Sequence, residues 1–422
     1  MSNNFNILEF AGLSKDRPWE LSQPLPTDLR AVITTEQYPT LEDVGKKIAT
    51  YVGESIEAQE IQSIDKDCIW TMRVRLDGMP TDFVLWIEPL ADTLKEEVEI
   101  DAGWVLALQT VLDTSDPLTH FSNLMRLLAG ADLCVHSIYD VPTGRWFPRQ
   151  VLEKVFLQSA FESPEEVLWI TRLVEAPSDG DPEDRWAWIT THGLTRCGRM
   201  ELEMLGVPAV LSTEAIQLID GLAALTLESP LPSAGQVISL GPQIIASVMP
   251  CEQAIQLLDE AMPGDEARTV PSVAIVSSDG SSVYPLDALN NLRTGEIAVA
   301  KTLRYTQRKA SIARDQWDLL IRAAQHIGSS EHATCMVQVP WSNVDDEDAP
   351  REYLWFRIVE VKDRTVVGEL AHKPQYATDL PERHREDMHP DDITDWLLMT
   401  PVGPMGPDDA EAIDEFLTQF TS

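Results

Sequence analysis

The sequence predicts a multi-domain α+β protein in which mixed or antiparallel sheets pack with helices. The chain of 422 residues exceeds a single typical core, because domains usually hold roughly 100–200 residues. Hydrophobic residues make up 44% of it, enough to bury several cores. Short strand patterns and amphipathic helix patterns also follow one another along the chain with no internal repeat.

The first predicted domain, residues 1–100, is a small α+β unit that follows an irregular, proline-rich N-terminal arm. Thr40 and Asp43 form a capping-box pattern, which predicts the start of a helix. Apolar residues then alternate with polar ones, as in a strand with one wet face. The predicted strands are 30–33, 70–76 and 83–87, with a turn at 78–80 between the last two.

The second predicted domain, residues 101–305, is a layered α+β sheet domain. Asp116 before Pro117 is typical of a helix N-cap, and Gly130 of a helix end. Ser212 is expected to cap another helix. The remaining predicted elements are strands at 131–139, 167–170, 186–189, 236–240 and 272–276, helices from 148 and 250, and an irregular loop at 177–184.

A reactive-looking stretch lies inside this domain. The strand at 186–189 leads into a turn with Gly193 and Gly198, and we expect an amphipathic helix to begin near Arg199. The stretch is therefore predicted to be the strand-to-helix corner of the domain.

The third predicted domain, residues 306–422, is again α+β. A basic segment spans its N-terminal boundary. We interpret this segment as a solvated helix face that pairs with the chain's own acids. That segment contains Lys301, Arg304, Arg308 and Lys309. A helix around Trp317 follows, then strands at 334–339, 353–361 and 365–370, an acidic loop at 345–348, a hairpin turn at 362–364, a charged loop at 382–389 and a helix from 407.

The charge balance excludes several partners. With 69 acidic and 32 basic residues the formal net charge is -37, which repels phosphate, so we expect neither nucleic acid nor an anionic membrane as a partner. The acidity serves either solubility or a basic protein partner. Oligomeric state is left open.

The cysteines and the hydropathy pattern indicate a compartment. Five scattered cysteines without paired spacing are typical of reduced thiols, and the N-terminus lacks the pattern of a secretion signal. We find no apolar run close to the roughly 18–20 residues that span a bilayer, and so expect no membrane-spanning helix. We therefore expect a cytoplasmic protein.

Two regions resemble known families. The third domain contains residues 352–358, 367–370 with Pro374, and 392–396 with its Asp-Trp ending. Through these segments it resembles the bacterial family called domain of unknown function 2314. The longer charged loop at 382–389 departs from that pattern. In the central region, a pattern similar to domains of unknown function 4026 and 4261 is formed by Thr191, Gly193, Leu194, Gly198, Glu201, Leu202 and Glu203. These resemblances imply a fold and a bacterial cytosolic origin, and they lend no catalytic residue.

The candidate binding residues are His192, Arg196, Arg199, Glu201 and Trp396. A histidine and a carboxylate offer an acid and a base, and two arginines can clamp a carboxylate or phosphate. The structural alternative is that the glycines permit the turn while arginines and glutamates balance one another.

No catalytic residue, metal site or cofactor is assigned. Cys197 beside His192 lacks the third partner that a cysteine nucleophile needs. His384 and His389 are five residues apart, which suits one helix face poorly, and Pro390 interrupts the segment. No phosphate loop, nucleophile elbow or dinucleotide fingerprint is present.

Three functions follow as hypotheses. The first is a non-catalytic protein-binding or immunity-type interaction protein whose acidic surface docks on a basic partner. The second is a hydrolase-like enzyme with its site near His192, Arg196, Arg199 and Glu201. The third is a scaffold that exposes some of the 12 tryptophans.

Overall fold

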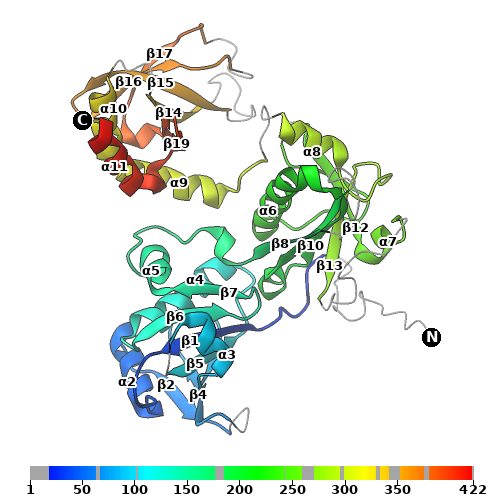
Figure 1. The fold of residues 1–422 in the computed structure, drawn as a ribbon, viewed down its shortest axis with the longest axis vertical. Coiled ribbons are helices and arrows are strands. Elements are labelled where there is room, and N and C mark those ends of the chain that lie inside the picture. The colour runs from blue at the N-terminus through cyan, green and yellow to red at the C-terminus, as the bar shows by residue number, and fades with distance from the viewer. Residues whose placement is uncertain are drawn as a thin grey trace. The chain divides into compact units, whose positions relative to one another are not determined.

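Three β-sheets organise the chain (Figure 1). The computed structural model describes residues 19–62, 67–100, 103–175, 185–241, 243–258, 270–294, 299–328, 333–341, 352–374 and 380–420. Two compact units are present, Met1–Thr302 with two of the sheets and Leu303–Ser422 with the third. The predicted α+β class with mixed or antiparallel sheets is confirmed. The loops predicted at 177–184 and 345–348 lie outside the described residues.

The first sheet is antiparallel throughout, in the order β2-β3-β4-β5-β1-β6-β7. Its strands are β1 (Thr27–Ile33), β2 (Glu57–Glu60), β3 (Trp70–Arg75), β4 (Phe83–Pro89), β5 (Trp104–Thr110), β6 (Val135–Asp140) and β7 (Arg145–Pro148). The helical segments that follow or interrupt these strands are α2 (Leu41–Val52), α3 (Asp92–Val98), α4 (Pro117–Gly130), α5 (Arg149–Leu152) and η1 (Glu153–Leu157).

Local capping places the two long helices of this sheet. Thr40 accepts a hydrogen bond from the Asp43 amide at the start of α2, and Asp116 accepts one from the Thr119 amide at the start of α4. Both predicted caps are confirmed. The helices bury residues such as Ile48 and Phe121 in the core that contains the inward side chains of the sheet.

The predicted boundary near residue 100 falls inside this sheet. Strand β5 pairs with β4 on one side and with β1 on the other, so the strand after residue 100 completes the sheet begun before it. The acidic segment expected to separate two domains is helix α3. Its Leu94 and Val98 pack on a small apolar cluster that includes Val105 of β5.

The second sheet has the order β11-β12-β13-β10-β9-β8, and β10 and β13 are parallel. Its strands are β8 (Ile170–Glu175), β9 (Trp186–His192), β10 (Glu201–Pro208), β11 (Val237–Ser239), β12 (Ile245–Pro250) and β13 (Ser272–Val276). The helical segments are η2 (Glu165–Val167), η4 (Leu194–Cys197), η5 (Ala209–Leu211), α6 (Ser212–Glu228), α7 (Cys251–Ile255) and α8 (Leu286–Arg293).

The helix predicted from Arg199 is wrong, because that segment forms strand β10. Both faces of β10 are buried, so its apolar residues do not show the simple alternation of a half-exposed strand. Two smaller expectations also fail. The strand predicted at 167–170 begins only at Ile170, and Ser212 is the first residue of α6 without a side-chain cap.

One helical stretch is longer and more apolar than expected. Among the described residues, Ala209–Glu228 passes the length and composition test for a membrane span, contrary to the expectation that no such run exists. This is weak evidence, because a core helix passes the same test. Its main part, α6, buries Leu218, Ile219 and Leu222 in the core shared with the sheets.

The C-terminal unit contains an antiparallel sheet in the order β17-β16-β15-β14-β18-β19. Its strands are β14 (Thr334–Trp341), β15 (Glu352–Lys362), β16 (Thr365–Leu370), β17 (Arg385–Met388), β18 (Asp395–Thr400) and β19 (Gly403–Met405). Its helices are α9 (Leu303–Asp315), α10 (Trp317–Ile327) and α11 (Ala410–Phe420), and short turns form η7 (Pro390–Asp392) and η8 (Pro407–Asp409).

Charged residues of this unit pair within it. Arg308 and Lys309 on α9 both contact Asp408, as expected of a helix face that pairs with the chain's own acids. The charged segment predicted to be a loop at 382–389 instead contributes strand β17, whose register on β16 places Arg385 beside Glu369. The ion pair between Arg385 and Glu369 favours the extended conformation of this segment.

Glu369 provides an expected pH dependence. It accepts hydrogen bonds from Arg385 at 2.7 Å and Arg357 at 3.1 Å, and the bond to Arg385 is the main cause of its lowered pKa. A carboxylate with a lowered pKa stabilises the fold above its unfolded pKa of about 4.3, and this contribution is lost as the pH falls. We therefore expect Glu369→Gln to reduce stability at neutral pH and to match the wild type in strong acid.

Thermal unfolding of both proteins between neutral pH and about pH 3 measures this difference. Glu411→Gln on α11 is a control with the same change of charge. A Glu369→Gln deficit that stayed constant with pH would contradict the assignment.

Candidate functional site

The turn predicted as a site is a single 3₁₀ segment between two glycines. Gly193 precedes η4 with φ of 123° and Gly198 follows it with φ of 75°. A Cβ on Gly193 would lie 2.3 Å from the carbonyl oxygen of Leu168, so no other residue fits there without movement. The glycines thus allow β9 and β10 to lie side by side with the turn folded against η2.

Glu201 holds this turn from inside. Its carboxylate accepts hydrogen bonds from the Gly193 amide at 2.9 Å, the Thr195 amide at 3.0 Å and the Thr195 hydroxyl at 3.0 Å. Its other oxygen accepts from the Thr191 hydroxyl at 2.8 Å. With 1% of its surface exposed, Glu201 is committed to the backbone of the turn.

Arg196 is fully buried and points into the protein. Its Nη1 donates to Asp140 Oδ1 at 2.6 Å, and its Nη2 donates to the Leu168 carbonyl at 2.7 Å. The guanidinium lies 4.5 Å from the centre of the Phe121 ring. The second Asp140 oxygen accepts from the Thr143 hydroxyl at 2.5 Å. Arg196 therefore joins strand β6 of the first sheet to the turn of the second.

Arg199 and His192 lie at the margins of the turn. Arg199 donates to the Thr226 carbonyl at 2.7 Å and lies 3.6 Å from Glu20. The His192 ring is partly exposed, and its pKa is lowered, first by burial and then by Arg172. The printed partners of Arg196 and Arg199 thus lie outside the turn, and neither includes the neighbouring Glu201.

The described part of the N-terminal arm, residues 19–26, is bonded to the turn and to the segment around Pro232, and residues 1–18 of the arm lie outside the described residues. The Leu21 amide donates to the Gly198 carbonyl at 2.9 Å, and the Leu25 amide donates to the Thr195 carbonyl at 3.1 Å. The indole of Trp19, 5% exposed, donates to the Pro232 carbonyl at 2.6 Å. The segment expected to be irregular is thus tied to the turn by hydrogen bonds.

Trp396 does not belong to this group. It lies on β18 in the C-terminal unit, is fully buried, and donates from its indole nitrogen to the Ala313 carbonyl at 3.1 Å. This bond fastens α9 to the sheet. The ring is part of the core of its unit.

Nucleophile and metal chemistry find no support at these positions. Burial raises the pKa of Cys197 to about 12, so its thiol is protonated at neutral pH. His384 contacts Glu386 at 3.0 Å. Within the described ranges, no group of three or more histidine, cysteine or acidic side chains is arranged to hold a metal ion.

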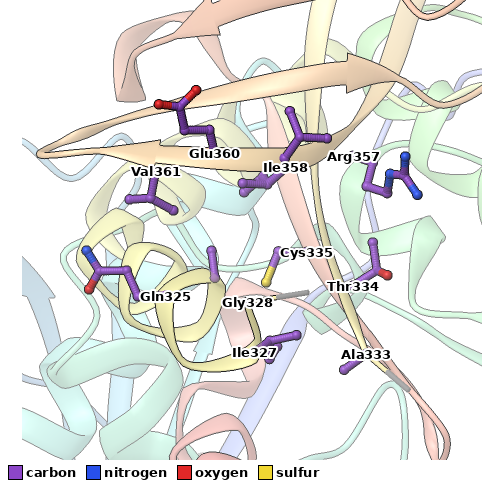
Figure 2. Close-up of a pocket in the computed structure, with 12 residues that line it drawn as sticks. Gln325, Ile327, Gly328, Ala333, Thr334, Cys335, Arg357, Ile358, Glu360 and Val361 are labelled. Carbon is purple, nitrogen blue, oxygen red and sulfur yellow. The ribbon is translucent and has the colours of Figure 1, made fainter. Parts of the chain in front are cut away.

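A cavity of about 470 Å³ lies in the C-terminal unit between the end of α10 and strand β15 (Figure 2). Ile358 and Ile327 line it together with the buried thiol of Cys335, whose pKa burial raises to about 12. In Figure 2 the carboxylate of Glu360 and the guanidinium of Arg357 point away from its centre. The lining also includes Gln325 and Thr334, so the cavity is mixed in polarity.

Sequence reasoning missed a row of side chains on the face of the first sheet that α3 partly covers. The register places Trp86, Ala107, Arg30, Tyr139 and Trp146 side by side across β4, β5, β1, β6 and β7. Residues paired in this way share one face of a sheet. We call these five residues the aromatic row.

One half of the aromatic row already holds a cation. The Arg30 guanidinium lies 4.8 Å from the centre of the Trp86 ring, and it donates to Asp28 at 2.7 Å and to Glu88 at 2.7 Å. The Trp86 indole nitrogen donates to the same Glu88 at 2.9 Å. The hydrogen bond to Asp28 and its charge contribute to a raised pKa of Arg30, against the effect of burial.

The other half repeats the indole-to-glutamate bond. The Trp146 indole nitrogen donates to Glu97 of α3 at 2.9 Å, and the Trp146 and Tyr139 rings lie 4.8 Å apart. Both rings are partly exposed. In the part of the chain that the structure describes, no cation lies over either ring. The period-two pattern of Asp28, Arg30 and Val32 was the only sequence signal for this face.

Comparison with known proteins identifies two families. Residues 174–272 match the model of the C-terminal part of a protein of unknown function, DUF4026, and residues 307–418 match DUF2314, an uncharacterized protein conserved in bacteria. Both expected resemblances are confirmed at these ranges, while the resemblance to domain of unknown function 4261 stays a prediction. No curated protein and no solved structure matches the chain.

Proposed function

We propose that this chain acts by binding a basic partner protein through an acidic surface, without catalysing a reaction. The observation that carries the proposal is the formal net charge of -37, to which both units contribute. Residues 1–302 contain 46 acidic and 20 basic residues, and residues 303–422 contain 23 and 12. Such an excess attracts a basic partner at long range and repels nucleic acid and anionic membranes.

The burial of the predicted site residues argues against the hydrolase hypothesis. Arg196 and Glu201 are 0% and 1% exposed, and their polar atoms bond to groups of the same chain. A hydrolytic site would need at least one of them to reach a substrate. Of the hydrolase hypothesis, the partly exposed His192 and Arg199 remain, and the Arg199 guanidinium already bonds to the Thr226 carbonyl and lies 3.6 Å from Glu20.

Binding of a labelled basic peptide to the full-length protein tests the proposal. We expect an arginine–serine repeat peptide to bind at about 50 mM salt and several-fold more weakly at about 150 mM, because screening shortens the reach of surface charges. Fluorescence anisotropy measures the affinity. A glutamine–serine repeat peptide should not bind.

An unrelated folded protein of similar size and net charge is the control. The affinity at a specific site must be higher than the affinity that net charge alone produces. If the control protein bound the basic peptide equally well, or if the chain did not bind it, the proposed function would be wrong.

A further inference from the structure

The two tryptophans of the aromatic row are held in the same way but are differently occupied. Each indole nitrogen donates to a glutamate at 2.9 Å, Trp86 to Glu88 and Trp146 to Glu97. The first pair carries the guanidinium of Arg30 over its ring. The second pair, with Tyr139 packed beside it, carries no cation among the described residues. Arg30 over Trp86 is thus an example, within the chain, of a cationic side chain bound by a tryptophan that bonds to a glutamate.

We propose that Tyr139, Trp146 and the exposed acids of α3 form the docking surface for an arginine or lysine side chain of a basic partner protein. This inference rests on the proposed function and gives it a location. An aromatic ring attracts a cation through its negative face, and a nearby carboxylate strengthens that attraction. Trp146 presents its ring between Tyr139 and Glu97, as Trp86 presents its ring beside Glu88.

The charges that α3 contributes to this surface favour a basic occupant. Glu96, Glu97 and Glu99 are exposed in the last turn of α3 and at its C-cap, and Lys95 is paired with Asp92 at 2.8 Å. Carboxylates at a helix C-terminus add to the negative end of the helix dipole, which is unfavourable for the helix by itself. A partner's positive charge at this end would relieve that repulsion.

The surface is also partly apolar, which distinguishes it from other acidic regions of the sheet. Val98 and Trp146 pack on the cluster below α3 and remain partly exposed. The edge strand β2, in contrast, exposes Glu57 and Glu60 with no aromatic ring in the strand. The glutamates of β2 lie in register with β3, where Glu57 is opposite Arg75, and β2 itself contributes no ring.

Substitutions in the full-length protein test the location. We expect Glu96→Gln with Glu97→Gln to weaken binding of the arginine–serine peptide about fivefold or more, because the carboxylate that bonds to Trp146 and its exposed neighbour on α3 are both neutralised. The glutamine amide oxygen can still accept the Trp146 bond. Tyr139→Leu is expected to weaken binding about two- to fivefold by removing one aromatic face.

The matched control is Glu57→Gln with Glu60→Gln on β2, which changes the net charge by the same amount in the same sheet. We expect it to change the affinity less than twofold. Circular dichroism and thermal unfolding show whether each variant keeps its fold. Tyr139→Phe should retain binding, because it keeps the ring and loses only the hydroxyl.

The outcomes separate the two proposals. Weaker binding by both surface variants and not by the β2 control supports this inference. If the wild type bound the peptide while the two glutamate pairs gave equal losses and Tyr139→Leu gave none, the inference would be overturned and the proposed function would stand. Failure of the wild type to bind the peptide would overturn both.

Discussion

Replacing Arg196 by alanine is expected to lower the free energy of unfolding of the N-terminal unit by about 3–5 kcal/mol. The substitution leaves the Asp140 carboxylate buried with only the Thr143 hydroxyl, and it leaves the Leu168 carbonyl without its charged donor. It also empties the space in front of the Phe121 ring. Urea unfolding followed by far-ultraviolet circular dichroism measures the loss.

Arg75→Ala is the control for this prediction. Arg75 lies 3.7 Å from Asp82, and the two side chains are 68% and 43% exposed, so we expect a loss below about 1 kcal/mol. Both changes remove one arginine from the N-terminal unit. If Arg196→Ala cost no more than Arg75→Ala, the buried pair would not be what joins the two sheets.

A double-mutant cycle with Asp140→Ala completes the test. Removing Asp140 alone leaves the guanidinium of Arg196 buried without its counter-ion, so it should be as damaging as removing Arg196. The double variant is expected to be less destabilised than the sum of the two single variants, because no unpaired charge remains. Additive losses would indicate that the two residues act separately.

The sequence allowed good prediction where a structure is set by neighbouring residues. The caps at Thr40 and Asp116 are local, since each side chain bonds an amide three residues along the chain. The hairpin turn at 362–364 is similarly local, with Asp363 in the left-handed region between β15 and β16. In the C-terminal unit such patterns predicted the first three strands, whereas β17, β18 and β19 were not predicted.

Prediction was poor where partners are distant. Glu201 and Glu203 were read as helical because acids near a helix start are common, whereas in β10 each is buried beside groups of β9, such as Thr191 and Trp188. The apolar pattern of a strand buried on both faces does not separate it from a helix. The acids could be buried only because strand pairing supplied their donors.

The candidate site could not be placed for a related reason. The sequence predicts that Arg196 shares a site with its neighbours Arg199 and Glu201. Its counter-ion is Asp140, which lies 56 residues earlier in another sheet. The aromatic row likewise combines residues of five strands, which sequence spacing does not bring together. Long-range pairing decided which charges became internal and which stayed at the surface.

Replacing Glu201 by alanine is the second substitution with a large expected effect. It removes the acceptor of the Gly193 and Thr195 amides and of two hydroxyls, inside a region shielded from water. A buried donor left without an acceptor costs about 1–3 kcal/mol, so we expect a loss of at least about 3 kcal/mol. Urea unfolding measures the total, and hydrogen exchange of the peptide spanning residues 193–198 should become faster.

Glu201→Gln separates the charge from the shape. Its amide oxygen can replace only one of the two carboxylate oxygens, while its NH₂ group faces donors, so we expect a loss of about 1–3 kcal/mol that is smaller than that of alanine. Glu57→Ala on the exposed edge strand should cost less than about 0.5 kcal/mol. If Glu201 were instead held in the turn for a ligand, its removal would stabilise the protein or leave it unchanged, because functional carboxylates are commonly kept at a cost to stability.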